Sequence, residues 1–218
     1  MSLTLQNAIT EVRDILNEAS PVFWSDDQIT KWIQEGCRNF STKTLLYETT
    51  ETLTTAQLTD GQMVYTSSDE AWIGDLLEVY AAIYYDGTSA YKGLVKVHPR
   101  KIGNLATSTA GHPKYYTQFG RSLYIWPVPS AAVAAAGEIS FLVSKETDDI
   151  TVLSDEYQHI PITYAKAMAL HRDKMYSQAQ AHLMQFKEEV QMERADKHNR
   201  EVDTLMSFKV PTGGQTNA

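Results

Sequence analysis

Paired carboxylates are the residues of this chain whose type and spacing come nearest to a catalytic arrangement. Four adjacent pairs occur: Asp26-Asp27, Asp69-Glu70, Asp148-Asp149 and Asp155-Glu156. Hydrolysis of a glycosidic bond needs two carboxyl groups about 5–10 Å apart in a cleft, one of them with a raised pKa. Neighbours in the sequence, at predicted helix caps and turns, do not indicate such a cleft. A cell-wall hydrolase or carbohydrate-binding module therefore stays an alternative rather than the favoured function.

The histidines and the single cysteine do not indicate a metal site or a nucleophile by their spacing. His171 and His182 would lie about 16 Å apart on one continuous helix, which is too far to share a metal ion. Cys37 falls on the apolar face of a predicted helix, where a small buried side chain is expected. The sequence has no glycine-rich nucleotide loop, nucleophile elbow or H-E-x-x-H motif. We therefore predict no catalytic residue, no metal and no cofactor.

Aromatic residues gather in the middle of the chain. They are Tyr80, Tyr84, Tyr85, Tyr91, Tyr115, Tyr116, Tyr124 and Trp126. Such side chains pack well on strands, and on an exposed sheet face they can also stack on sugars or bases. Residues 45–155 carry a net charge of -6, which disfavours nucleic acid. Tyrosine and tryptophan are enriched at protein–protein interfaces, which is the function we predict for this stretch.

The whole chain of 218 residues is acidic, with a formal net charge of -8. A protein that coats DNA or RNA neutralises phosphates with Lys and Arg, so that class is disfavoured. The first residues lack a basic and apolar leader, and no apolar run approaches the ~20 residues of a membrane helix. We expect a soluble protein without membrane contact that is made and kept in a reducing compartment, or released from one.

Helical spacing of apolar residues occurs near both ends of the chain. A first helix is predicted over residues 5–19, and a second begins after Ser25, whose spacing to Gln28 forms a capping box. The final third is again helical, over residues 157–171 and from residue 175 to about Leu205.

Strand patterns fill the middle of the chain. They cover residues 47–53, 62–66, 76–85, 90–97, 114–119, 122–126 and 138–143. We predict about six short antiparallel strands, as in a small sandwich or barrel. The predicted fold class is α+β: an antiparallel helical bundle from residues 1–44 and 156–206, a β-rich insert at 45–155, and an extended tail at 207–218.

Three segments carry a resemblance to a known family. Residues 23–36 read FWSDDQITKWIQEG, residues 113–129 form a predicted Pro- and Tyr-rich hairpin that ends in WPVP, and residues 157–162 read YQHIPI before a long helix. In this order and spacing they resemble the head–tail adaptor proteins of tailed bacteriophages, also called head completion or gatekeeper proteins.

The resemblance implies a structural virion protein that carries out no reaction. It implies a ring of about twelve copies beneath the portal protein, which extends the DNA channel and docks the next tail or nozzle protein. Viral DNA would pass without specific binding, because an acidic lumen repels phosphate. A closed ring is built from heterologous contacts, so each copy needs two different patches.

The resemblance also guides the choice of interface residues. In the folded parts we expect them to include Trp24, Trp32, Tyr84, Tyr85, Tyr115, Tyr116, Tyr124 and Trp126. The family's C-terminal arm often engages the portal, so residues 206–218, with Lys209 and Pro211, are the candidate arm.

Overall fold

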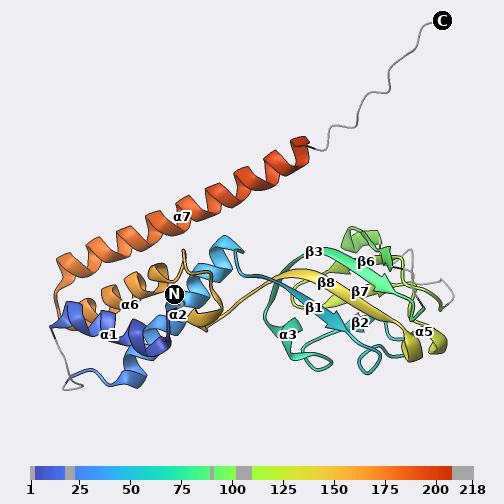
Figure 1. Cartoon of the computed structure of the whole chain (residues 1–218), viewed down its shortest axis with the longest axis horizontal. Helices are drawn as coiled ribbons and strands as arrows, with labels where there is room; N and C mark the ends of the chain where they lie inside the picture. Colours follow the sequence, from blue (N-terminus) through green and yellow to red (C-terminus); the bar gives the residue numbers. More distant parts are fainter. Residues whose placement is uncertain (1–2, 18–22, 89–90, 102–109, 208–218) are drawn as a thin grey trace, which may run out of the picture.

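Helices occupy both ends of the chain and two β-sheets lie between them (Figure 1). This computed structural model describes residues 3–17, 23–88, 91–101 and 110–207. The helices are α1 (Leu5–Leu16), α2 (Asp26–Thr44), α3 (Ala71–Gly74), α5 (Ala131–Ala136), α6 (His159–Arg172) and α7 (Tyr176–Ser207), with 3₁₀ turns η1 (Pro99–Lys101) and η2 (Ile150–Val152). The predicted α+β class is confirmed.

The strands of the described residues form two sheets of four. They are β1 (Glu48–Leu53), β2 (Val64–Tyr65), β3 (Leu76–Tyr85), β4 (Tyr91–Gly93), β5 (Val95–Lys96), β6 (Tyr115–Gln118), β7 (Leu123–Trp126) and β8 (Glu138–Lys145). Sheet A has the order β1-β8-β3-β4 and sheet B the order β2-β7-β6-β5. One hydrophobic cluster takes buried side chains from both sheets, so the arrangement is a β-sandwich.

Local capping explains the bounds of the first two helices. The Gln28 N–H donates to Ser25 Oγ over 3.2 Å at the start of α2, so the predicted cap is confirmed. α1 ends at Leu16, earlier than predicted, because Asn17 takes a left-handed conformation with φ 55° and its N–H bonds back to the last turn. Residues 18 and 19 lie outside the described part of the chain.

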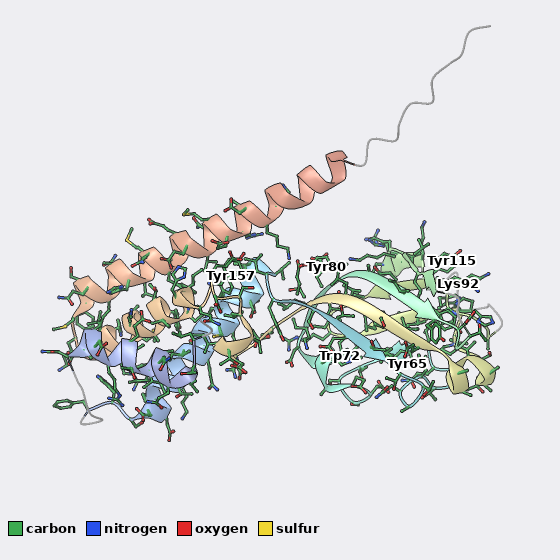
Figure 2. The ribbon with its side chains drawn as sticks, viewed as in Figure 1. Tyr65, Trp72, Tyr80, Lys92, Tyr115 and Tyr157 are labelled. Carbon is green, nitrogen blue, oxygen red and sulfur yellow. The ribbon has the colours of Figure 1, made fainter. Side chains whose placement is uncertain are left out.

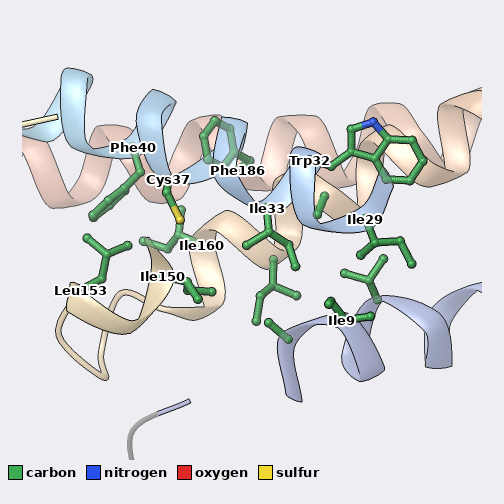
Figure 3. Packing of buried hydrophobic residues seen from close by; sticks show 14 of the residues in the cluster. Ile9, Ile29, Trp32, Ile33, Cys37, Phe40, Ile150, Leu153, Ile160 and Phe186 are labelled. Carbon is green, nitrogen blue, oxygen red and sulfur yellow. The ribbon is translucent and has the colours of Figure 1, made fainter. Parts of the chain in front are cut away.

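The helices α1, α2, α6 and α7 share one hydrophobic cluster, shown from close by in Figure 3. Ile29, Ile33 and Phe40 of α2 are fully buried in it. α2 lies very close to α6: a Cβ at Gly36 would be 2.8 Å from the Pro161 carbonyl oxygen. A glycine at position 36 therefore permits this approach of the two helices.

α7 is the longest element, with 32 residues. Its inward side chains include Ala179, Phe186, Val190 and Lys197, which are buried and follow one another at spacings of seven, four and seven residues, so they lie on one face of the helix. Figure 1 shows α7 running along the other helices and continuing in the direction of the sandwich. The predicted end near Leu205 agrees with the observed end at Ser207.

The connection between β4 and β5 corrects the strand prediction. We predicted one strand over residues 90–97, antiparallel to β3, but the chain changes sheets at Leu94. β4 pairs with β3, whereas β5 pairs with β6 in parallel. Leu94 is buried and its N–H donates to the Ala82 carbonyl over 2.8 Å, which holds the crossing between the two sheets. In the described part of the chain the sandwich therefore has eight strands and is not entirely antiparallel.

Two short helices were not predicted. α3 precedes β3 and buries Trp72 and Ile73, whereas α5 connects β7 with β8 and buries Val133. Alanine is the best helix former, so the alanine-rich run at 131–136 carried a helical signal. Its short length obscured that signal.

Candidate interaction surfaces

The predicted aromatic interface residues divide into buried and partly exposed groups. Trp32, Tyr84, Tyr116 and Trp126 are at most 5 % exposed. The side chains of Trp24, Tyr85, Tyr115 and Tyr124 are partly exposed. Lys209 and Pro211 lie outside the described residues. The structure therefore leaves only the second group accessible to a partner, and its interface role stays a prediction.

The buried aromatic residues stabilise the sandwich and the helices. The Tyr116 hydroxyl donates to the Tyr80 carbonyl over 3.1 Å, and its ring meets Phe141 edge-on. The Tyr84 hydroxyl lies 3.1 Å from His112 Nδ1. Burial raises the pKa of both tyrosines. Aromatic enrichment alone did not distinguish packing of this kind from binding.

Two of the partly exposed tyrosines lie on the outer face of sheet B. Tyr115 is opposite Trp126, and Thr117 is opposite Tyr124 in the β6–β7 ladder. Side chains alternate across a strand, so these four residues share one face, and Tyr116 lies on the other. On the shared face Thr117 and Trp126 are buried, so Tyr115 and Tyr124 are its partly exposed members. Val95, opposite Tyr115 in the next ladder, is 57 % exposed. This face offers aromatic and aliphatic surface to a partner.

A polar cluster joins the helices to the sandwich at Leu45, the residue that ends α2. Leu45 adopts φ 58°, and its carbonyl oxygen accepts hydrogen bonds from three side chains. The donors are Lys197 Nζ from α7, Tyr80 Oη from β3 and Ser144 Oγ from β8. The cluster therefore ties α2, α7 and sheet A together at one backbone atom. We call it the Leu45 cluster.

Lys197 is the cation of the Leu45 cluster. Its ammonium lies 2.9 Å from Glu48 Oε1 and 4.7 Å from the centre of the Tyr80 ring, and it donates to the Tyr80 hydroxyl. Burial would lower the pKa of Lys197, but the hydrogen bonds to Tyr80 and Glu48 outweigh it and raise the pKa. Lys197 is thus charged at neutral pH. Figure 2 shows Tyr80 where α7 passes the start of the sandwich.

The second connection between helices and sandwich, near residue 147, is also polar. The Thr147 N–H donates to Ser41 Oγ over 3.2 Å, and Arg38 Nη2 lies 2.6 Å from Asp148 Oδ2. The Arg38–Asp148 pair is about half exposed and contributes little. The first crossing is therefore fastened by side chains from α7 and sheet A, and the second by side chains from α2.

Cys37 and the two histidines at 171 and 182 lie in environments that do not indicate a catalytic or metal site. Cys37 is buried, as predicted, and burial, followed by the nearby Asp149 and Asp148, raises its pKa to about 12. His171 and His182 belong to different helices, α6 and α7. In the described residues no group of three or more His, Cys, Asp or Glu side chains is placed to hold a metal ion. No helix of that part of the chain is both long and apolar enough to cross a membrane.

Charge is distributed unevenly along the sandwich sequence. Residues 45–86 contain eight acidic residues and no basic residue. Residues 87–137 contain six Lys or Arg residues and no acidic residue. The segment net charge of -6 therefore conceals two oppositely charged halves, which the sequence prediction did not separate.

The order of elements agrees with the resemblance noted in the sequence. A capped pair of helices, a β-sandwich containing the β6–β7 hairpin, and a long terminal helix follow the arrangement of segments noted for head–tail adaptors of tailed phages, which are structural virion proteins. The model of the SU10 adaptor protein family matches residues 3–206. The chain belongs to this family of phage head–tail adaptors. No curated protein matches the chain.

Proposed function

We propose that the protein forms a ring of about twelve copies beneath the portal of a tailed phage. The match of the SU10 adaptor family to residues 3–206 carries this proposal, because it spans all the described helices and strands except the final residue of α7. The ring extends the DNA channel and presents the docking site for the next tail component. The protein acts through binding surfaces and performs no reaction.

The two ends of the molecule serve different partners in this proposal. α7 extends beyond the other helices, and the sequence continues past it to residue 218. We assign this end, including Lys209 and Pro211, to the portal. The outer face of sheet B, with Tyr115 and Tyr124, then serves neighbouring copies or the tail.

The proposal is tested by size measurement with and without the portal. Gel filtration with light scattering is performed on the protein alone, on the matching portal protein, and on their mixture. We expect the mixture to contain a complex of portal with a ring of about twelve adaptors, whether or not the adaptor is monomeric alone. A monomer that ignores the portal would refute the proposal.

A truncated chain ending at Ser207 tests the portal-binding end separately. We expect it to keep the fold, because among the residues whose side chains are described the hydrophobic clusters contain none beyond Val190. We also expect it to lose binding to the portal. Undiminished binding would assign the portal contact to another surface.

A further inference from the structure

The two long sides of the sandwich carry opposite charge. The crossing at Leu94 makes β4 and β5 the edge strands of their sheets on one side. β1 and β2 are the edge strands on the opposite side. In Figure 1, β1 and β2 lie along the lower border of the sandwich, and β3 and β6, the inner neighbours of β4 and β5, lie toward the upper border.

The side formed by β4 and β5 is basic. Its cations are Lys92, Lys96, Arg100, Lys101 and Lys114. Lys92 lies on β4, and the Lys114 carbonyl accepts the Val95 N–H over 2.9 Å, which places Lys114 beside β5. All five are exposed, and Figure 2 shows Lys92 at the end of the sandwich away from the helices. We call this set the basic edge.

Four cations of the basic edge are available to a partner. In the described part of the chain only Lys96 has an anionic neighbour, with its Nζ 3.6 Å from Glu78 Oε1. Lys92, Arg100, Lys101 and Lys114 form no ion pair there. A protein with a net charge of -8 thus keeps four unneutralised cations along one side.

The side formed by β1 and β2 is acidic. Its anions are Glu48, Glu51, Asp60, Asp69 and Glu70. Within this set, Glu48 and Glu51 pair with Lys197 and Lys145. No cation among the described residues pairs with Asp60, Asp69 or Glu70, which are carried by the loops on either side of β2. We call this set the acidic edge.

β1 also exposes backbone hydrogen-bonding groups on the acidic edge. It has six residues, and among the described strands it pairs only with β8. The Lys145 N–H donates to the Tyr47 carbonyl, and hydrogen-bonded pairs alternate in an antiparallel ladder. The N–H and C=O groups of Thr50 and Thr52 therefore point away from β8, toward the open side. An open strand edge is a common docking element for another chain.

We propose that the basic edge of one copy docks against the acidic edge of the next copy. This inference rests on the proposed ring and names the surfaces that build it. A heterologous contact requires two different, mutually complementary patches on each copy, and the two edges supply them on opposite sides of the sandwich. Binding of DNA phosphate would use the basic edge but leave the acidic edge and the open side of β1 without a partner.

The first test reverses the charge of the basic edge in the full-length chain. The variant combines Lys92→Glu, Arg100→Glu, Lys101→Glu and Lys114→Glu. Its control reverses four exposed cations of the helical part: Lys31→Glu, Lys174→Glu, Lys187→Glu and Arg194→Glu. Both have the same net charge. We expect the control to form rings on the portal and the basic-edge variant to form none, as seen by negative-stain electron microscopy.

The second test reverses the acidic edge with Thr50→Lys, Asp60→Lys and Glu70→Lys. We expect this variant, without the other variant, to form no rings on the portal. Mixed in equal amounts with the basic-edge variant, it should restore them, because every contact in an alternating ring then joins a basic edge to an acidic edge. Rescue of this kind is not expected of two merely unfolded proteins, and circular dichroism of each variant checks the fold.

The outcomes separate the edge assignment from the ring itself. If the wild type forms no ring with the portal, the proposed function fails. If the wild type forms rings and so do both edge variants, or if mixing does not restore rings, the edge assignment alone is overturned. Rings lost equally in the helical control would overturn it as well, because net charge would then suffice. Binding of a DNA duplex by the wild type that only the basic-edge variant loses, with rings intact, would assign the basic edge to DNA.

Discussion

Replacement of Lys197 by Met removes the cation of the Leu45 cluster while keeping a side chain of similar length. Lys197 contacts the Leu45 carbonyl, the Tyr80 hydroxyl and ring, and the Glu48 carboxylate. We expect Lys197→Met to destabilise the attachment of α7 to the sandwich rather than the helical core, because the core side chains of α7 lie in earlier turns, at Phe186 and Val190.

The loss of stability expected for Lys197→Met follows from the contacts that are lost and those that remain. Hydrogen bonds to a charged group contribute about 1.5–3 kcal/mol, and a cation over an aromatic ring about 0.5–1 kcal/mol. The pair with Glu48 adds little, since that carboxylate is nearly half exposed. The Leu45 carbonyl keeps Ser144 and Tyr80 as donors and is not left unsatisfied. We therefore expect a net loss of about 2 kcal/mol.

Hydrogen exchange followed by mass spectrometry locates this effect. Peptides that contain the α7 turns around Lys197 and the start of β1 should exchange faster in Lys197→Met, whereas peptides of α2 around Ile33 should not change. Thermal unfolding should shift downward by roughly 4–8 °C, given about 2–4 °C per kcal/mol for a chain of this size.

Two comparisons decide whether loss of the Leu45 cluster contacts causes the destabilisation in Lys197→Met. Lys187→Met, an exposed position on the same helix with no ion pair among the described residues, should stay within about 0.5 kcal/mol of the wild type. A double-mutant cycle with Tyr80→Phe should yield a coupling of about 1 kcal/mol. Equal effects of Lys197→Met and Lys187→Met, with zero coupling, would show that the cluster does not hold α7.

Two further substitution and labelling experiments test the helical core. Gly36→Ala gains about 0.5–1 kcal/mol of helix propensity but forces a Cβ to within 2.8 Å of the Pro161 carbonyl oxygen, at a cost of about 1–3 kcal/mol. Chemical denaturation should therefore show a net loss of about 1–2 kcal/mol in the free energy of unfolding. A gain in stability, like that expected for the exposed control Thr42→Ala, would contradict the close packing of α2 and α6. Cys37, whose pKa is raised to about 12 by burial, should react with a thiol reagent at pH 8 only as fast as the protein opens, and at once in denaturant; rapid labelling of the native protein would contradict its burial.

Elements with a local signal could be predicted from the sequence. β3 spans residues 76–85 as predicted, because apolar and aromatic residues, with Glu78 as the one charged residue, run up to the Asp86-Gly87 turn. The start of α2 follows from the Ser25 side chain alone. In both cases the residues that decide the structure are neighbours in the chain.

Features that depend on distant residues could not be predicted. The change of sheet at Leu94 is decided by contacts with Ala82 and with β6, which are far along the sequence. The burial of Tyr84 and Tyr116 depends on the opposite sheet, so their aromatic character did not reveal whether they pack or bind. Likewise, only the strand order places the acidic edge and the basic edge on opposite sides of the sandwich.

That assignment changes what the net charge of -8 implies. An evenly acidic surface would repel both DNA and other copies of the same chain, so it would hinder the ring that the family membership suggests. Segregation of charge removes this conflict, because each copy can present an acidic edge and a basic edge to different neighbours while the total stays negative. If the edges meet, their charges neutralise each other within the ring, and the remaining acidic residues dominate the exposed surface. An assembly that joins copies electrostatically and still releases DNA therefore requires both the total charge and its separation across the sandwich.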